Sequence, residues 1–320
     1  MSCSTDLIRI CNCFQGTILL WPPRRITARE MASAASITPR SLSFEWMPIR
    51  QVDLDDNLRI WRSFKMGKLM DLIILDTRQY DRSITGLGWN DDYIDLIRDD
   101  ASRSIMGHPQ EQWFYDSLSE SNERGAAWRV IGNQLIFSRV FENDECKLSA
   151  DNWNAYIANR NRTLKHLYDN EIGNNVFLAG DSHQNWVSDL AWLGIKDYDS
   201  ESGEGAIGVE FAGTAVSSTG KEGPIEPVAG DAARGMVNRN EEMHWQEGYY
   251  RGYFRLAVTP KQVAAQFFGS PSVASRNSWD LPLANFTVDS SDNHLSRPVA
   301  DGRAESGGLK YGGEILHSKT

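Results

Sequence analysis

A carboxylate and an imidazole stand two positions apart near the middle of the chain, at Asp181 and His183. They follow the short apolar run of residues 176–179 (VFLA), whose length and composition predict a buried strand. Carboxylate and imidazole groups are ligands for divalent or trivalent metal ions, which can hold phosphate or activate water. The same residues also fit a turn after a strand, with Asp181 capping the turn and His183 packed nearby.

Two other predicted strands also end in polar side chains. Residues 72–75 (LIIL) lead to Asp76 and Arg78, and residues 128–131 (WRVI) lead to Gln134. The Arg78 guanidinium could contact a phosphate oxygen while Asp76 orients it, or the two side chains could form a structural ion pair. Gln134 could bind a hard cation through its amide oxygen, hydrogen-bond a metal-bound water, or satisfy buried loop backbone.

Blocks of sequence from residue 44 to about residue 268 resemble the PhoD-like (alkaline phosphatase D) family of metallophosphatases, and they occur in the order found in that family. So many matching blocks in one order make the resemblance specific. The blocks are residues 44–50 (FEWMPIR), 60–64 (IWRSF), 75–80 (LDTRQY), Gly107 with Gln110 and Trp113, 128–134 (WRVIGNQ), Asp151 with Trp153, Tyr156 and Arg160, 180–183 (GDSH), 210–214 (EFAGT), 245–253 (WQEGYYRGY) and 259–260 (TP).

The resemblance implies an α/β fold, a metallophosphatase-like two-sheet sandwich flanked by helices. It implies a cluster of metal ions at the strand ends, iron and calcium or divalent alternatives. It also implies hydrolysis of a small-molecule phosphomonoester or phosphodiester, in which metal-bound water or hydroxide attacks phosphorus. By the same resemblance Asp181 and His183 are metal ligands, Gln134 is a further metal-site candidate, and Arg78 is a catalytic candidate.

Other parts of the family pattern are absent from the sequence. A cluster of two or three metal ions needs roughly six protein ligands. The family takes several of them from earlier blocks resembling Gly-Asp-Tyr and Asp-Asp-His-Glu, whereas no histidine precedes His108 here. Asn154 and Ala155 stand where the family usually has Asp and Gly. We therefore expect only the C-terminal part of the catalytic domain, without its N-terminal strands. A truncated, non-catalytic relic or binding module is the alternative function.

Composition changes divide the chain into three parts. We expect an unassigned leader over residues 1–43, the partial PhoD-like domain over 44–270 and an irregular tail over 271–320. Within the domain, residues 151–168 predict a helix capped by Asp151, with Arg160 in a structural salt bridge. Residues 245–258 and 262–268 predict two antiparallel strands that close the sheet. His244 could be a further ligand, but a place at the rim of the sheet is favoured.

Charge and composition limit the partners. The chain has 320 residues, a formal net charge of −10 and 41% hydrophobic residues, as in an ordinary soluble globular protein. The negative charge disfavours nucleic acid and anionic membranes, so local groups must attract a phosphorylated substrate. The spacing of the 4 cysteines does not imply a disulfide framework. Relatives are often exported, but the leader lacks the pattern of an export signal and contains no membrane span.

Overall fold

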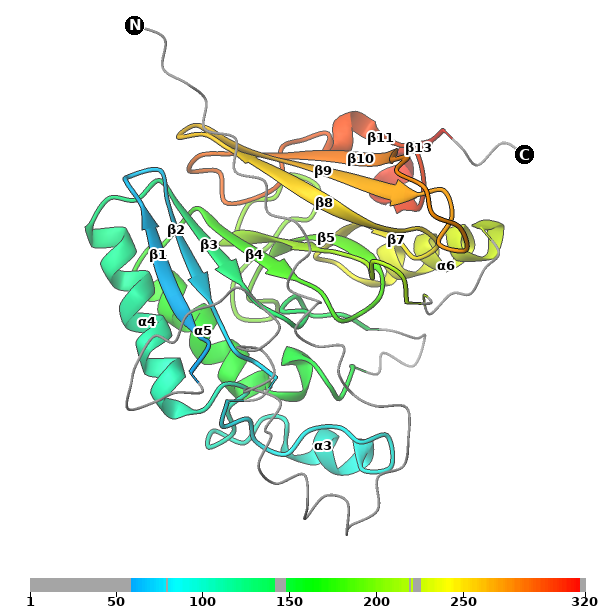
Figure 1. Ribbon diagram of the computed structural model, residues 1–320. Coiled ribbons are helices and arrows are strands. Elements are labelled where there is room, and N and C mark those ends of the chain that lie inside the picture. Colours follow the sequence, from blue (N-terminus) through cyan, green and yellow to red (C-terminus); the bar gives the residue numbers. More distant parts are fainter. Residues whose placement is uncertain (1–58, 79, 142–147, 219, 221–225, 317–320) are drawn as a thin grey trace, which may run out of the picture.

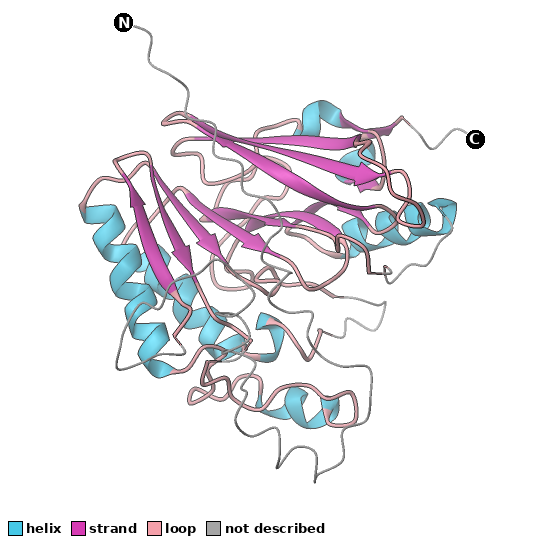
Figure 2. Ribbon diagram, in the orientation of Figure 1, coloured by secondary structure: helices cyan, strands magenta, loops and turns pink. Residues whose placement is uncertain are grey.

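An eight-stranded mixed sheet forms the centre of the described part of the chain, and a smaller sheet packs over one of its faces (Figure 1). The computed structural model describes residues 59–316 except residues 79, 142–147, 219 and 221–225. The strand order of the large sheet is β1-β2-β3-β4-β6-β5-β7-β12. Figure 2 shows the strands of the two sheets stacked as layers, with helices outside them.

Four neighbouring strands of the large sheet run parallel to one another. They are β2 (Met70–Ile74), β3 (Trp128–Gly132), β4 (Asn175–Ala179) and β6 (Gly208–Ala212). Every residue of β3, β4 and β6 is buried. Continuous burial is expected for parallel strands covered on both faces, and it explains their unbroken apolar runs.

Antiparallel strands extend the large sheet on both sides of this parallel core. At one side β1 (Arg62–Met66) pairs with β2 and is mostly exposed. At the other side β5 (Asn185–Leu190) pairs with β6, β7 (Met243–Glu247) with β5, and β12 (Gly308–Leu309) with β7. Since β7 is antiparallel to β5, it runs in the same direction as β6 and ends at the same edge.

The second sheet has the order β10-β9-β8. Its strands are β8 (Arg251–Val258), β9 (Gln262–Ser270) and β10 (Leu281–Asp289). Buried and partly exposed residues alternate along β9, so one face of this sheet turns inward. Phe267 on that face packs against Phe211 and Trp245 of the large sheet, with ring centroids 6.3 and 5.1 Å apart.

Helices cover the other face of the large sheet, as Figure 1 shows for α4 and α5. Phe114 of α4 (His108–Glu123) and Leu164 of α5 (Ile157–Asp169) belong to one buried cluster with Ile73, Ile131 and Phe177 of the sheet. Bounds of the remaining elements are α3 (Asp91–Ile97), α6 (Glu226–Arg239), η1 (Trp153–Ala155), η2 (Val299–Gly302), β11 (Arg303–Ala304), η3 (Lys310–Gly312) and β13 (Glu314–Ile315).

The predicted α/β fold with two sheets and flanking helices is confirmed, but three local predictions are wrong. Residues 245–258 contribute to two strands in different sheets, because β7 ends at Glu247 and β8 begins at Arg251. The tail predicted to be irregular contains β10, whose residue Phe286 is buried in the core. The predicted helix over residues 151–168 begins only at Ile157, after the short η1.

His244 is also placed differently from the prediction. It is fully buried in β7 instead of lying at the rim, and its Nε2 is 3.1 Å from Oδ2 of Asp189. The predicted leader of residues 1–43 lies outside the described residues. Across the part of the chain that the structure describes, every helix is too short or too polar to cross a bilayer.

Candidate functional site

The carboxyl ends of the parallel strands bring the predicted site residues to one edge of the large sheet. Arg78 follows β2, Gln134 follows β3, Asp181 and His183 follow β4, and Thr214 follows β6. Strands that run parallel end at the same edge, and ligands of open α/β sheets bind there. The topology therefore places these side chains together, although up to 136 residues of sequence separate them (Arg78 to Thr214).

Asp181 and His183 both adopt the left-handed backbone region, with φ of 68° and 58°. This region is uncommon for residues with a side chain and costs free energy unless neighbouring groups hold it. Here Nη1 of Arg251 and Oγ1 of Thr214 both donate hydrogen bonds to the carbonyl oxygen of His183, at 2.9 and 3.1 Å. The turn is thus held by a side chain that follows the end of β6 and by one at the start of β8.

Thr214 is itself held by a buried network around Glu247, and Nη2 of Arg251 donates to the carbonyl oxygens of Gly248 and Tyr249 in the turn that follows Glu247. The Glu247 carboxylate accepts hydrogen bonds from the backbone N–H groups of Tyr249 and Tyr250 and from Nδ2 of Asn185. Asn185 in turn accepts a 3.0 Å hydrogen bond from the Thr214 backbone N–H. Burial raises the pKa of Glu247 to about 7, although these hydrogen bonds oppose the shift. The network connects the His183 turn to three strands.

The Arg78 guanidinium lies between two carboxylates at this edge. Its Nη2 is 3.4 Å from Oδ1 of Asp181, and its Nη1 is 2.9 Å from Oδ2 of Asp151. Asp76 accepts a hydrogen bond from the Arg78 backbone N–H at 3.3 Å. The alternative prediction, a structural ion pair between Arg78 and Asp76, is therefore wrong. The Arg78 guanidinium pairs instead with Asp151 and Asp181, which come from two other segments of the chain.

Burial and neighbouring charges shift the pKa values of these two aspartates in opposite directions. Burial raises the pKa of Asp181, and the nearby Arg78 opposes that shift only in part. Burial also acts on Asp151, but Arg82 and Arg78 together hold its pKa below its ordinary value. A buried carboxylate whose ionised form is under-stabilised gains from another cation nearby. Another cation close to Asp181 would therefore stabilise its ionised form.

Asp151 is the residue whose role was misassigned from the sequence. It does not cap α5, which begins six residues later at Ile157. Its Oδ1 instead accepts hydrogen bonds from Nη2 of Arg82 at 2.9 Å and from Oγ1 of Thr85 at 2.8 Å. Asp151 was visible in the family pattern, but local sequence contains no signal for Arg82 and Thr85, since they lie at least 66 residues away.

Gln134 lies at the predicted edge of the large sheet, and its side-chain amide is hydrogen-bonded to the turn after β2. Its Oε1 accepts hydrogen bonds from the backbone N–H and the hydroxyl of Thr77, at 2.8 and 2.7 Å. Its Nε2 donates to the carbonyl oxygen of Leu75 at 2.5 Å. An amide oxygen that already accepts two hydrogen bonds has its lone pairs occupied. In this geometry Gln134 positions the turn that presents Arg78.

Two other buried carboxylates close to the sheet, Glu210 and Glu242, contact other groups. Glu210 accepts hydrogen bonds from the backbone N–H groups of Phe137 and Ser138, and Glu242 pairs with Arg160 at 3.3 Å. The prediction that Arg160 forms a structural salt bridge is confirmed. Among the described residues, no group of three or more His, Cys, Asp or Glu side chains converges as a metal site would. Asp181 and His183 thus supply at most part of a ligand set.

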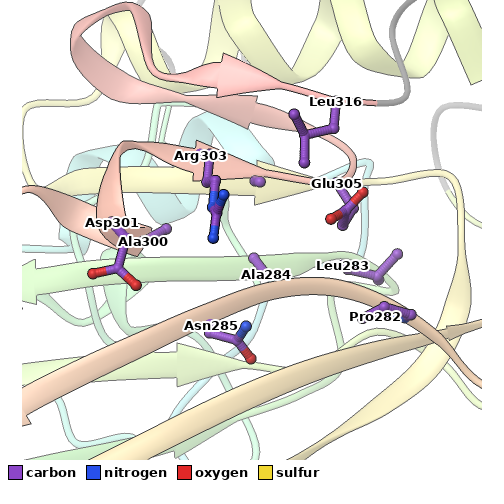
Figure 3. Close-up of a pocket in the computed structure, with 10 residues that line it drawn as sticks. Pro282, Leu283, Ala284, Asn285, Ala300, Asp301, Arg303, Glu305 and Leu316 are labelled. Atoms are coloured by element: carbon purple, nitrogen blue, oxygen red, sulfur yellow. The ribbon is translucent and has the colours of Figure 1, made fainter.

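A pocket of about 240 Å³ lies elsewhere, between β10 and residues 300–305 (Figure 3). Leu283 and Ala284 of β10 line one side of it, and Arg303 and Leu316 line another. None of the predicted site residues lines this pocket. The candidate site is therefore defined by its convergent charged groups at the sheet edge and not by this cavity.

Comparisons with known proteins agree with the fold and with the order of the motifs. The PhoD-like phosphatase family matches residues 33–267. Alkaline phosphatase D of Bacillus subtilis (strain 168) is 29% identical over 276 residues, which are 85% of this chain and 45% of that protein. The solved structure of PhoD has a TM-score of 0.69 at 26% identity and covers 92% of this chain and 53% of its own.

The chain thus spans about half the length of the relatives it matches. The family match nevertheless extends over more than half of this chain and includes β1 to β8 and most of β9. The residues at the sheet edge, from Arg78 to Arg251, all lie inside the matched region. The protein is therefore a member of the PhoD-like phosphatase family.

Proposed function

We propose that this protein acts in metal-dependent hydrolysis of phosphate esters, with its site at the carboxyl edge of the large sheet. The observation that supports this most directly is the ion pair between Arg78 and Asp181, two residues from His183, in a member of a phosphatase family. A guanidinium and a pair of metal-type ligands at one strand edge are the groups that phosphoryl transfer needs.

Arg78 would bind the phosphate group of the substrate. Its planar guanidinium matches two phosphate oxygens, and Asp151 fixes its orientation through the 2.9 Å contact. Gln134 would act indirectly, because it holds the turn at Thr77 that presents Arg78. The negative net charge of the chain does not attract an anionic substrate, so this local positive group supplies the attraction.

Asp181 and His183 would hold a metal ion, for which iron and calcium are the candidates that the family suggests. The donor types fit, since Asp181 is a buried carboxylate with a raised pKa and His183 lies in a turn held from two other strands. Their number does not complete a metal site within the described residues. Such an ion would neutralise phosphate charge and acidify water.

A second candidate function is phosphate binding without hydrolysis. The observation that favours it is the absence of three converging metal-type side chains among the described residues. Arg78 would then still bind the phosphate group, while Asp181 would serve as the partner that positions Arg78. The first function requires a bound metal ion and hydrolysis of the phosphate ester, whereas the second requires only that the protein binds phosphate.

Purified full chain, loaded with iron and calcium, distinguishes them. Release of p-nitrophenol from p-nitrophenyl phosphate and from bis-p-nitrophenyl phosphate separates phosphomonoesterase from phosphodiesterase activity. Hydrolysis that is lost in Asp181→Asn and kept in Asp116→Asn, a matched aspartate on the exposed side of α4, supports the proposed function. Binding of inorganic phosphate without hydrolysis of either ester supports the second candidate.

A further inference from the structure

Large apolar side chains are concentrated on the surface segment that follows Arg78. Ile84, Leu87, Trp89, Tyr93 and Leu96 are between 51% and 83% exposed. These five residues, which we call the apolar ridge, lie within a stretch of 13 consecutive positions of the chain. Single exposed apolar residues are ordinary, whereas five large ones in one short segment favour a surface that binds a ligand or a partner.

The apolar ridge is built on an ordered support. Ile94 of α3 is fully buried and anchors the helix, while Tyr93 and Leu96, three positions apart, are on its exposed side. The side chain of Asn90 ties the preceding loop together, because it accepts from the Leu87 backbone N–H at 2.7 Å and donates to the Thr85 carbonyl oxygen at 3.1 Å. The backbone that carries the exposed side chains is therefore held in place.

The same segment is attached to the candidate site. Thr85, between Ile84 and Leu87, donates a 2.8 Å hydrogen bond to Asp151, and Asp151 pairs with Arg78. Four residues of extended chain span at most about 14 Å, so Trp89 lies within that distance of Thr85. Figure 1 shows α3 on the side of the large sheet toward which β2, β3 and β4 point.

We propose that the apolar ridge binds the alcohol portion of the substrate, and that the substrates are phosphoesters of large, uncharged, apolar alcohols. This inference relies on the proposed function for the position of the phosphate group at Arg78. Continuity with Arg78 through Thr85 and Asp151 favours this occupant over a separate protein partner.

The charges around the apolar ridge favour an uncharged occupant. Asp91, Asp92 and Asp95 lie on α3 among the exposed apolar residues, and Asp95 is paired with Arg98. Carboxylates at this surface repel a second anionic group, which disfavours a polyphosphate or a nucleic acid strand. An alkyl or aryl group has no charge to be repelled and gains from covering Trp89 and Leu96.

Calorimetric titration of the full chain with ethylphosphonate and n-octylphosphonate tests the inference without requiring turnover, because the C–P bond is not hydrolysed. Each buried methylene contributes about 0.8 kcal/mol, and partial burial on an open surface contributes less. We therefore expect octylphosphonate to bind more tightly by on the order of tenfold or more. In the double variant Trp89→Ser, Leu96→Ser we expect this preference to fall to within about twofold.

The variant Trp279→Ser is the matched control, since Trp279 is 75% exposed in the loop between β9 and β10. It should keep the preference of the wild type. Equal affinity for the two phosphonates, or a preference that survives the double variant, overturns the inference. So does a change of molecular mass of the double variant in sedimentation, which would assign the apolar ridge to contact between copies. If the wild type prefers octylphosphonate but hydrolyses neither nitrophenyl ester, that result counts against the proposed function and not against binding of apolar groups by the apolar ridge.

Discussion

Arg78 and Asp181 form an ion pair at the carboxyl edge of the large sheet, with Nη2 and Oδ1 3.4 Å apart. The pair joins the end of β2 to the end of β4 across the intervening β3. It leaves a buried carboxylate with a raised pKa next to a guanidinium that Asp151 holds in place. The proposed binding of phosphate by Arg78 and of a metal ion by Asp181 depends on this relationship.

Replacing Arg78 should weaken substrate binding. Arg78→Gln removes the guanidinium that can bind two phosphate oxygens. Because hydrogen bonds to charged groups contribute about 1.5–3 kcal/mol, KM for p-nitrophenyl phosphate should rise by roughly 10- to 100-fold. Arg78→Lys should recover only part of the loss, because an ammonium makes no bidentate contact. Arg98→Gln, which removes an arginine paired with Asp95 on α3, is the control. An unchanged KM in Arg78→Gln would exclude Arg78 from substrate binding.

Arg251 should control metal affinity although it is not a ligand. Its guanidinium holds the carbonyl oxygen of His183, and the loss of residues that orient ligands costs roughly 10- to 100-fold in metal affinity. We expect Arg251→Gln to weaken iron or calcium binding by about tenfold in calorimetry while the protein stays folded by circular dichroism. Arg255→Gln, in the same strand with its side chain on Gln266, should leave affinity unchanged. Equal affinities of the two variants would refute the role of Arg251.

Glu247 should make stability depend on pH. Burial raises its pKa from 4.5 to about 7 in the folded protein. The folded state therefore binds this proton more tightly than the unfolded state, so its contribution is complete below pH 4.5 and is lost as the pH rises through about 7. The Tm of the wild type minus that of Glu247→Gln should fall over this interval and level off above it. A difference that stays constant or increases with pH would contradict the assignment.

Gln134 should contribute to stability through the turn after β2. In Gln134→Ala the buried Thr77 N–H and Leu75 carbonyl lose their partner, which costs about 1–3 kcal/mol in the free energy of unfolding. Urea denaturation measures this loss, and Gln112→Ala on the exposed side of α4 is the control. If Gln134→Ala keeps its stability but loses bound metal, Gln134 is a direct ligand instead.

Part of the site could be predicted from the sequence because parallel strands end at one edge. The apolar runs before Arg78, Gln134 and Asp181 identified three strands, and their order of pairing brings those residues together. The pairing of Asp151 with Arg78 and Arg82 could not be predicted, since 73 and 69 residues separate these partners and no local pattern joins them.

The wrong predictions for β10 and for His244 each have a physical reason. The alternation along β10 is interrupted between Pro282 and Ala284, where the register with β9 shifts, so the strand does not show a regular period of two. His244 can be buried because Asp189 of β5 and Tyr198 of the loop between β5 and β6 both lie 3.1 Å from its Nε2. A histidine without visible partners is assigned to the surface by sequence reasoning, since a buried polar group must be paired.

Metal content of matched histidine variants tests the central claim most directly. The wild type, His183→Ala and His108→Ala would be purified after loading with iron and calcium and analysed by inductively coupled plasma mass spectrometry. His108 is exposed at the start of α4 and serves as the control. The account predicts bound metal in the wild type and in His108→Ala and its loss in folded His183→Ala. Unchanged metal content in His183→Ala would contradict it.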